Sequence, residues 1–290
     1  GERVYQKIWS ESILMTIGVI GQGYVGTAIK LGFEDHYKVL TYDKFDLGKS
    51  THSKISDIVE ETEVIFVCVP TPMRKDGTCY TGIVEEVIRE INETANDHII
   101  VIKSTIPPGT TDRINKEYTH STVIFNPEFL TEENFLDDFK NQNRIILGGD
   151  RKGTNKLRQI YSKVFPQATI VKTGSKTAEM VKYFTNTFLA TKVSFANEMY
   201  HICDQVGIDY DKVVEYATYD ERLGKSHWAV PGPDGDFGFG GHCFPKDLSA
   251  IINSFDTYGL LEAVENVNDQ LRSDRDWEHM VGRAVLEEDE

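Results

Sequence analysis

Positive charge is scarce in this 290-residue sequence, with 31 Lys and Arg residues against 46 Asp and Glu, a formal net charge of −15. Nucleic acids and anionic membranes are polyanions, so this chain is a poor partner for either. It also lacks an apolar run of about 18 residues, which a membrane-spanning helix needs. The first apolar stretch, near Ile13–Val19, is too short for a signal peptide and runs into a glycine motif.

Cysteine is scarce as well, and its four positions are Cys68, Cys79, Cys203 and Cys243. No two of them form a CxxC pair, which argues against a zinc site or a redox dithiol. The eight histidines show no ligand spacing either, so we expect no metal site. Without an export signal, we expect reduced thiols and a cytoplasmic location.

The first half of the chain has the pattern of an α/β protein. Short β-branched apolar runs alternate with amphipathic stretches, and such runs are typical of strands buried on both faces of a parallel sheet. The predicted strands are Thr16–Ile20, Val39–Tyr42, Val64–Val69, Ile99–Lys103, Thr122–Phe125, Arg144–Leu147 and Ala168–Val171. The helices predicted between them are Gly26–Phe33, Gly82–Thr94, Thr111–Tyr118 and Thr154–Phe165. This alternation predicts a doubly wound, Rossmann-like parallel sheet.

After about Thr173 the strand pattern stops and helices follow. The predicted helices are Ser175–Val206, Asp209–Tyr219, Pro245–Ser254, Tyr258–Leu271 and Asp276–Leu286. We therefore place a boundary near Gly174, between an α/β domain (residues 15–174) and a helical domain with one long central helix (residues 175–290). Residues 1–14 read as a leader before a native start at Met15, or as a short N-terminal arm.

The motif Gly21–Gly26 has the form GxGxxG and stands between the first strand and its helix, as a dinucleotide fingerprint requires. Gly21 permits the tight turn, Gly23 lets the backbone approach a pyrophosphate, and Gly26 lets helix and strand pack closely. Tyr24 and Val25 complete the turn at the helix N-terminus, which attracts anions. The alternative is a glycine-rich turn with no ligand.

An acid in the expected place supports the dinucleotide interpretation. Asp43 ends the second predicted strand, about 20 residues after Gly21, where an acid binds the ribose hydroxyls. Its charge would repel a 2′-phosphate. The sequence therefore predicts NAD as cofactor in preference to NADP.

The stretch Gly238–Asp247 is the richest in chemistry in the second half. Its glycines let the backbone pass close to a ligand. Cys243 precedes Pro245, a residue suited to the first turn of a helix, so the thiol would feel the helix dipole. Lys246 lies three residues on, and both effects favour a thiolate nucleophile. Asp247 lies four residues after Cys243 and can reach the same site.

Several separated motifs together resemble the UDP-glucose/GDP-mannose dehydrogenase family, over Thr16 to about Leu271. They are Gly21–Gly26, Val69–Pro72, Lys103–Thr110, Asn126–Leu130, Lys182–Asn186, Asp220–Gly224 and Gly238–Asp247. The resemblance is greatest to the UDP-glucose 6-dehydrogenases of that family. It implies two successive NAD-dependent oxidations at the C6 alcohol of a nucleotide sugar, with a cysteine thiohemiacetal and thioester between them. The product would be UDP-glucuronate for surface polysaccharide.

The resemblance also implies roles for single residues. Cys243 would be the nucleophile, Lys182 and Asn186 would face the oxyanion from one helix face, and Glu128 would act as acid and base through a water held by Thr105 and Asp247. The cofactor-binding residues implied in addition to the fingerprint are Pro70, Thr71, Thr105 and Glu132. The substrate-binding residues implied are Phe129, Leu130, Lys182, Asn186, Arg222, Phe237, Gly238, Phe239 and Gly240. Arg222 would reach the sugar of a neighbouring subunit, which predicts a homodimer.

Two departures from the family keep alternatives open. Family members continue into a third, UDP-binding domain, whereas this chain ends at Glu290, and its loop Trp228–Phe237 is longer than in many relatives. The substrate could therefore be UDP-N-acetylmannosamine or GDP-mannose, or the chain could be a truncated NAD-binding and dimerisation module without turnover. A one-step hydroxyacid dehydrogenase is a further alternative, although a single hydride transfer needs no cysteine.

Overall fold

The computed structural model describes residues 15–94 and 97–287, and the predicted leader lies outside these ranges. The described chain forms two compact units. The first comprises the described residues before Pro70, together with Ile83–Ser104 and Pro108–Glu179. The second comprises Pro70–Gly82, Thr105–Pro107 and the described residues from Met180 onward. Two short segments of the N-terminal half thus belong to the helical unit.

The first unit is built on a seven-stranded sheet with the order β2-β1-β3-β4-β5-β6-β7. Its strands are β1 (Thr16–Ile20), β2 (Lys38–Tyr42), β3 (Val64–Val67), β4 (His98–Ile102), β5 (Ser121–Phe125), β6 (Arg144–Gly148) and β7 (Thr169–Thr173). The strand pattern predicted from the sequence is confirmed, with shifts of one or two residues at the ends. Every residue of β3 and β4 is buried, which explains why their sequences are apolar and do not alternate.

One junction of the sheet departs from the predicted parallel arrangement. β5 and β6 are antiparallel and share a single pair, Phe125 with Gly148. Elsewhere the Asn115 side chain covers the edge of β5, since its amide group donates to the Val123 oxygen and its oxygen accepts from the Val123 N–H, both at 2.9 Å. An apolar run has the same pattern in either chain direction, so the sequence could not reveal this reversal.

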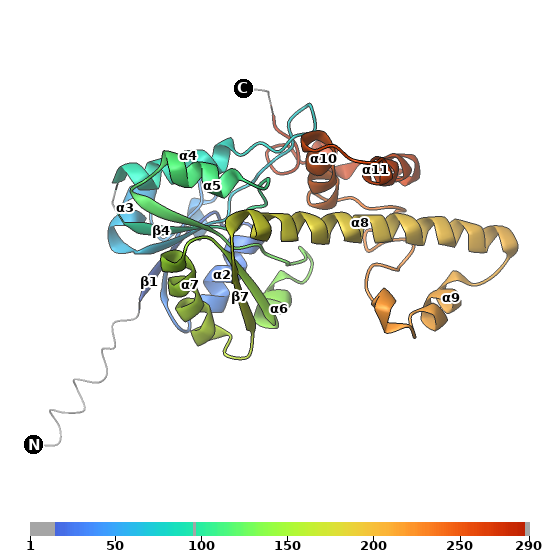
Figure 1. Cartoon of the computed structure of the whole chain (residues 1–290), viewed down its shortest axis with the longest axis horizontal. Helices are drawn as coiled ribbons and strands as arrows, with labels where there is room; N and C mark the ends of the chain where they lie inside the picture. The colour runs from blue at the N-terminus through green and yellow to red at the C-terminus, as the bar shows by residue number, and fades with distance from the viewer. Residues whose placement is uncertain (1–14, 95–96, 288–290) are drawn as a thin grey trace, which may run out of the picture. The chain divides into compact units, whose positions relative to one another are not determined.

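Helices cover both faces of the sheet (Figure 1). On one face lie α3 (Ile55–Glu61), α4 (Gly82–Thr94) and α5 (Thr110–Glu117), and on the other lie α2 (Tyr24–Phe33), α6 (Phe135–Lys140) and α7 (Arg151–Val164). A one-turn 3-10 helix, η1, spans Leu47–Lys49. The second face buries an aromatic cluster in which the Phe33 ring meets Phe66, Phe139 and Tyr161 edge-on at 5.5–5.7 Å between centroids. The sequence missed α3 and α6 because helices this short show no clear 3.6-residue period.

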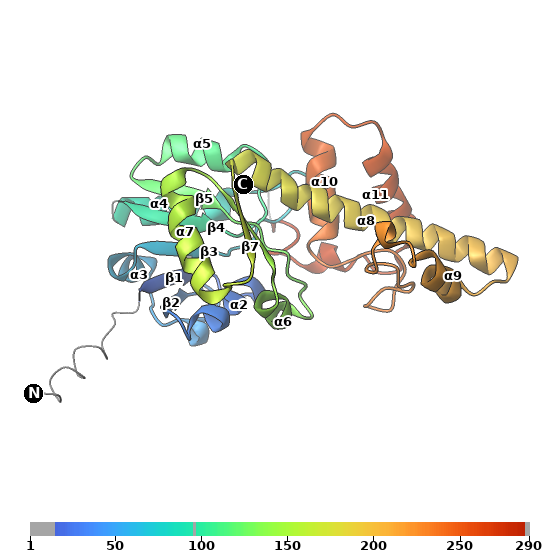
Figure 2. The ribbon, with the colours of Figure 1, turned by 60° about the horizontal axis from the view of Figure 1, so that its bottom comes forward.

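The second unit is helical, as predicted. Its elements are most of α8 (Ser175–Val206), α9 (Tyr210–Ala217), the 3-10 helix η2 (Glu221–Leu223), α10 (Phe244–Ser254), α11 (Leu260–Leu271) and the 3-10 helix η3 (Asp276–His279). Figure 2 shows α10 and α11 side by side along α8, and α9 near its C-terminal end. Residues Ala190, Phe239, Leu248 and Val264 form a buried cluster between them. Within the described ranges, no helix has both the length and the apolar character needed to cross a bilayer.

The predicted helix Asp276–Leu286 is wrong beyond His279. The chain instead pairs with the loop around Met73, whose N–H donates to the Ala284 oxygen at 2.7 Å and whose oxygen accepts from the Leu286 N–H at 2.9 Å. Gly282, two residues before Ala284, has a φ of +80°, which a helix excludes. A tertiary partner for these backbone groups has therefore overridden the helical pattern.

Glu179, on the first turns of α8, fixes the start of α5. Its carboxylate accepts hydrogen bonds from the Gly109 N–H at 3.0 Å, the Thr111 N–H at 3.1 Å and the Thr111 hydroxyl at 3.1 Å. The residue is completely buried. Burial raises the pKa of the Glu179 carboxyl from 4.5 to about 7, although the three donors oppose the shift. The helix junction therefore contains a carboxyl group that titrates near neutral pH.

This pKa predicts a pH-dependent stability. Between pH 4.5 and about 7 the folded protein holds the Glu179 proton more tightly than the unfolded chain does, so the contribution of this group to stability falls as the pH rises. We expect the unfolding free energy of the wild type to decline relative to Glu179→Gln by up to about 3 kcal/mol over this range. Urea unfolding at several pH values measures the difference. Parallel profiles for the two proteins would contradict it.

Candidate active site

The glycine turn after β1 has the geometry of a nucleotide cradle. Gly21 has a φ of +94°, and a Cβ there would lie 2.4 Å from the Cys68 carbonyl oxygen. A Cβ on Gly26 would lie 1.8 Å from the Gly21 oxygen. At Gly23, by contrast, no described atom lies within 4 Å of the Cβ position. The chain itself thus requires the first and third glycines, whereas the second borders open space that a pyrophosphate can fill.

The turn combines a positive helix end, which attracts an anion, with a carboxylate that can accept hydrogen bonds from hydroxyl groups. Gly23 precedes α2, and the first turn of that helix carries no acidic residue to offset its positive dipole end. Asp43 follows β2, and its carboxylate accepts from the Gln22 N–H at 2.7 Å, which places it against the glycine turn. Its other oxygen accepts from the Phe45 and Asp46 N–H groups at 2.8 and 3.0 Å. These residues fit NAD, with the pyrophosphate on the helix end and a ribose near the acid.

The contrast between two glycines gives a prediction. In Gly23→Ala the new methyl group meets no described atom, so we expect the melting temperature to stay within about 2 °C. The methyl group would instead occupy the space of the pyrophosphate and weaken NAD binding roughly tenfold or more. Calorimetric titration with NAD⁺ measures this effect. Gly26→Ala serves as the comparison, since its clash with the Gly21 oxygen should lower the melting temperature; equal NAD affinity in Gly23→Ala and wild type would argue against the cradle.

The loop after β5 carries four of the predicted site residues. Glu128 is buried, and its carboxylate accepts from the Leu130 N–H at 2.6 Å. The Arg144 guanidinium stacks on the Phe129 ring at 4.0 Å. Leu130 packs against the main core, whereas Glu132 is exposed. The loop is therefore anchored at its start, and Glu128 is held by the backbone of its own turn.

A buried polar cluster supports the start of this loop. The Lys103 ammonium donates to the Asn126 oxygen at 2.9 Å, and the Asn126 amide group donates to the Ile146 oxygen at 2.8 Å. The Tyr161 hydroxyl also donates to Asn126. The sequence singled out Lys103 and Asn126 only as parts of motifs. Their burial shows that they position the backbone ahead of Glu128.

The second unit contains a buried polar network around Asp247, with one ion pair at its centre. The carboxylate accepts from the Lys246 ammonium at 2.7 Å and from the Asn186 amide group at 2.7 Å. Lys246 also reaches the Thr71 hydroxyl at 3.4 Å, and that hydroxyl donates to the Thr105 oxygen at 2.8 Å. Four of the predicted residues, from segments far apart in the chain, therefore meet at one point.

The sequence indicated Lys246 only as a cation near the Cys243 thiol, whereas the structure gives it a further partner in Asp247. Burial is the largest single influence on its ammonium group and lowers the pKa, but the Asp247 carboxylate and the thiols of Cys79 and Cys243 together outweigh burial. The net result is a raised pKa, so Lys246 stays charged. Much of its charge is matched by Asp247, which the sequence argument did not foresee.

Cys243 occupies the position that the sequence predicted for a nucleophile. It is half-buried and immediately precedes α10, with Pro245 in the first turn of the helix. Its carbonyl oxygen accepts from the Asp247 N–H at 2.9 Å, which puts Asp247 one turn along the helix. The thiol thus lies at the positive end of a helix dipole, an arrangement that favours a thiolate.

Two of the other cysteines are poor nucleophiles. Burial raises the pKa of the Cys68 thiol to about 12, despite the opposing charge of Lys103. Burial also raises the pKa of the Cys79 thiol, which lies against the Thr71 and Thr105 oxygens. Neither group forms a thiolate near neutral pH. Cys203 is buried in a separate apolar cluster with Tyr210 and Val230.

The predicted substrate-binding and cofactor-binding residues lie in several parts of the described chain. Lys182 and Asn186 are both buried on α8, one turn apart. Arg222 is 89% exposed and lies outside this network, held by a bidentate ion pair with Asp220 at 2.6–3.1 Å. The loop Phe237–Gly240 leads directly to Cys243. Thr71 and Thr105 lie in the second unit, whereas the glycine turn, Asp43 and Glu128 lie in the first.

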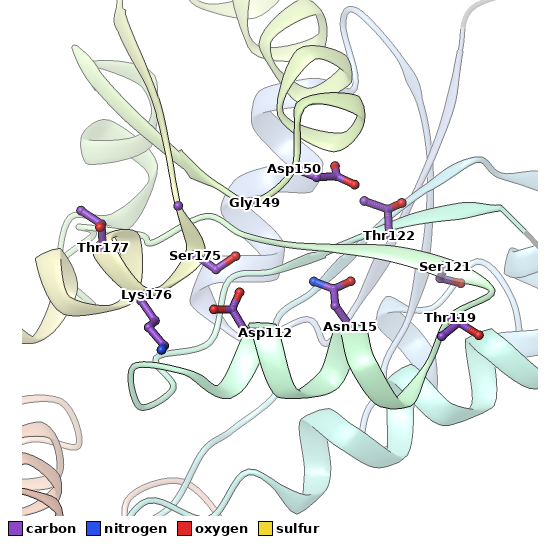
Figure 3. Close-up of a pocket in the computed structure, with 11 residues that line it drawn as sticks. Asp112, Asn115, Thr119, Ser121, Thr122, Gly149, Asp150, Ser175, Lys176 and Thr177 are labelled. Carbon is purple, nitrogen blue, oxygen red and sulfur yellow. The ribbon is translucent and has the colours of Figure 1, made fainter.

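A pocket of about 590 Å³ in the first unit contains none of the predicted site residues. Figure 3 shows it between α5, the start of β5, the loop before α7 and the start of α8. Its charged residues are Asp112, Asp150 and Lys176. It lies at the amino end of β5, whereas the glycine turn follows the carboxyl end of β1, so the two sites are distinct.

Comparison with known proteins agrees with this geometry. Residues 44–165 match the NAD-binding domain of the UDP-glucose/GDP-mannose dehydrogenase family, and residues 176–270 match its central domain. The UDP-glucose 6-dehydrogenase AglM of Haloferax volcanii is 31% identical over 88% of this chain and 70% of its own length. The chain belongs to the UDP-glucose/GDP-mannose dehydrogenase family. The predicted family, fold class and NAD cofactor are thereby confirmed.

Solved structures agree with the family assignment. A UDP-glucose dehydrogenase from Pyrobaculum islandicum has a TM-score of 0.78 and 30% identity, over 90% of this chain and 69% of its own. A UDP-D-ManNAc dehydrogenase from Pyrococcus horikoshii has a TM-score of 0.75 and 26% identity, over 89% and 69%. Other curated relatives are matched over only about half of their length. The members of this family are NAD-dependent nucleotide-sugar dehydrogenases, and they differ in the sugar that they oxidise.

Proposed function

We propose that this protein oxidises the C6 alcohol of UDP-glucose to the carboxylate of UDP-glucuronate, through a covalent intermediate on Cys243. The observation that carries the proposal is the arrangement around α10. A half-buried thiol lies at the helix N-terminus, and the buried Asp247–Lys246–Asn186 network lies one turn away. Such an arrangement suits a reaction in which a thiolate attacks a carbonyl carbon and negative charge develops on the oxygen.

The proposed reaction has two oxidations, separated by a covalent intermediate on Cys243. Glu128, through a water molecule, accepts the proton of the C6 hydroxyl as the first hydride leaves. The Cys243 sulfur then bonds to the aldehyde carbon, and the aldehyde oxygen takes up a proton to give a thiohemiacetal. Loss of a second hydride and of that proton gives the thioester, which water hydrolyses to the carboxylate and the free thiol. NAD⁺, when bound, accepts one hydride in each oxidation.

Lys182 and Asn186 stabilise the charge that develops on the substrate oxygen. Both are buried and lie four residues apart on α8, so they share one helix face. A buried ammonium and amide are stronger electrostatic partners than exposed ones, because water does not compete with the substrate oxygen. On the same unit, Thr105 and Asp247 bind the water molecule through which proton transfer runs.

The proposal includes a homodimer. Large apolar side chains stay exposed along one face of α8 at spacings of four or seven residues, namely Met180, Phe184, Phe188, Phe195, Ile202 and Val206. A continuous apolar stripe of this length marks a protein interface more often than a free surface. Arg222, exposed and rigidly paired with Asp220, would contact the sugar of the partner subunit. Sedimentation velocity of the whole chain measures whether the homodimer forms. The cytoplasmic location stays a prediction.

Two alternatives have specific support. The UDP-D-ManNAc dehydrogenase of similar structure favours a different sugar, since the motifs shared here act at C6 and not on the rest of the ring. An NAD-binding module without turnover is the second alternative, because the glycine turn and Asp43 belong to the first unit, whereas Cys243 belongs to the second. A one-step hydroxyacid dehydrogenase is less well supported, because Cys243 would then have no chemical role.

Counting NADH per sugar separates these functions. The whole chain is incubated with NAD⁺ and limiting UDP-glucose, UDP-N-acetylmannosamine or GDP-mannose, and NADH is read at its absorbance maximum. We expect two NADH for each UDP-glucose consumed. With each of the other two sugars, we expect the rate of NADH formation to be less than a tenth of the rate with UDP-glucose. One NADH per sugar would indicate a single oxidation. No NADH from any of them, with NAD⁺ still bound, would contradict the proposed activity of this chain.

A further inference from the structure

The turn Gly238–Gly241 is held by side chains from outside the turn. Asn197 on α8 accepts from the Gly238 N–H at 3.1 Å. Asn268 on α11 accepts from the Phe239 N–H at 2.8 Å and donates to the Phe239 oxygen at 2.9 Å. The Gly238 N–H, the Phe239 N–H and the Phe239 oxygen therefore each have a side-chain partner.

Asp276 holds the end of this turn. Both of its carboxylate oxygens lie 3.1 Å from the Gly241 N–H, two residues before Cys243. One of the same oxygens accepts from the Arg272 guanidinium at 3.3 Å. Three of the side chains that hold the turn come from one stretch of chain: Asn268 lies on α11, Arg272 directly follows α11, and Asp276 begins η3. We call these three residues the clamp.

Arg272 ties the clamp to the long loop before the turn. Its buried guanidinium donates to the Asp234 carboxylate at 2.8 Å and to the Asp274 carbonyl oxygen at 2.8 Å. The Asp236 carboxylate lies 3.5 Å from the guanidinium and accepts from the Ser273 and Asp274 N–H groups at 3.2 and 3.1 Å. Asp234 and Asp236 thus both bind Arg272, which makes them anchors of the loop.

The clamp accounts for two of the glycines. A Cβ on Gly238 would lie 2.3 Å from the Asn268 oxygen. A Cβ on Gly240 would lie 2.4 Å from both the Arg272 guanidinium and the Asp276 carboxylate. The side of the turn where side chains would project is therefore filled by the clamp. At Gly241 no described atom lies near the Cβ position, but its φ of +76° favours glycine.

We propose that Arg272 and Asp276 are positioning residues for Cys243. The expected effect on turnover rests on the proposed function, whereas the expected effect on the position and reactivity of the Cys243 thiol does not. By fixing the Gly241 N–H, Asp276 sets the backbone position from which α10 starts, and Arg272 keeps the Asp276 carboxylate in place. The Cys243 thiol is thereby held at the helix N-terminus in one orientation, where the thiolate is favoured.

The test compares Asp276→Ala and Asp276→Asn in the full chain. Iodoacetamide labels the thiols between pH 6 and 9, and mass spectrometry follows the peptide that contains Cys243. For Asp276→Ala we expect the alkylation rate at pH 7 to fall at least fivefold and its pH midpoint to rise. The kcat with UDP-glucose should fall tenfold or more, while the dissociation constant of NAD⁺ is unchanged. Asp276→Asn retains an acceptor oxygen, so its alkylation rate and its kcat should lie between those of Asp276→Ala and the wild type. If Asp276→Ala does not fold, the comparison of Asp276→Asn with the wild type tests the proposal.

Asp274→Ala is the matched control, since the Asp274 side chain is exposed and only its backbone contacts the clamp. It should alkylate and turn over as the wild type does. The proposal is overturned if Asp276→Ala lowers only the melting temperature and leaves the Cys243 rate and pH midpoint unchanged, or if the rate rises without a change in midpoint. If Asp276→Ala alkylates more slowly than the wild type as expected, but the wild type produces no NADH, the proposed function is contradicted and the clamp stays supported.

Discussion

Cys243→Ala is expected to produce no UDP-glucuronate and no more than one NADH per UDP-glucose. The alanine variant keeps the NAD-binding turn and the Asp247 network, but has no sulfur to capture the aldehyde. We expect the steady-state rate to fall by roughly three orders of magnitude or more, as happens when a covalent nucleophile is removed from an otherwise intact site. Chromatography of the products, together with NADH absorbance, measures both quantities.

Cys203→Ala provides the control for this substitution. It removes a thiol from the same unit, but that thiol is buried among Ala196, Tyr210 and Val230, in a cluster separate from Asp247. We expect it to retain the wild-type rate within about twofold while losing on the order of 1 kcal/mol of stability. Two NADH per sugar from Cys243→Ala would show that the second oxidation does not pass through this residue.

Asp247→Asn should cause the largest loss of stability among the single substitutions considered. The Lys246 ammonium and the Asp247 carboxylate are both buried and lie 2.7 Å apart. Neutralising the carboxylate leaves a buried positive charge without its counter-charge, which costs about 3–5 kcal/mol. We expect urea unfolding to show a loss of this size, and turnover should fall as well because Asn186 loses its charged partner.

Two comparisons isolate the charge effect. Lys246→Met combined with Asp247→Asn removes both charges, and should recover most of the stability lost in the single variant. Asp269→Asn removes an acid from an exposed ion pair with Arg275, and should change the unfolding free energy by no more than about 1 kcal/mol. If Asp247→Asn were as mild as Asp269→Asn, the network around Asp247 could not be the buried ion pair that the structure shows.

Several features could be predicted because local pattern encodes them. Apolar runs predicted the seven strands, most clearly β3 and β4, in which every residue is buried. The glycine turn and Asp43 follow from steric and electrostatic demands within about 20 residues of chain. The position of Cys243 at a helix start follows from Pro245 alone. In each case the residues that decide the structure are near one another in sequence.

Other features could be predicted only in part. Asp247 and Asn186 were identified as site residues, but their direct hydrogen bond joins positions 61 residues apart. Lys246 was expected to act on the thiol, whereas the structure pairs it first with Asp247. A motif identifies the residue types at a site without showing which of them satisfy one another. Those pairings depend on how α8 and α10 pack.

The sequence alone determined the α/β class, the nucleotide turn and the candidate nucleophile, because periodicity, glycine sterics and helix-start chemistry act within a few turns of chain. Tertiary structure decided the antiparallel junction at Phe125, the pairing of Met73 with Ala284 and Leu286, and the clamp on Gly238–Gly241. These features satisfy backbone N–H and carbonyl groups with partners distant in sequence. A buried polar group must find a partner somewhere, and only the folded chain shows which one it finds.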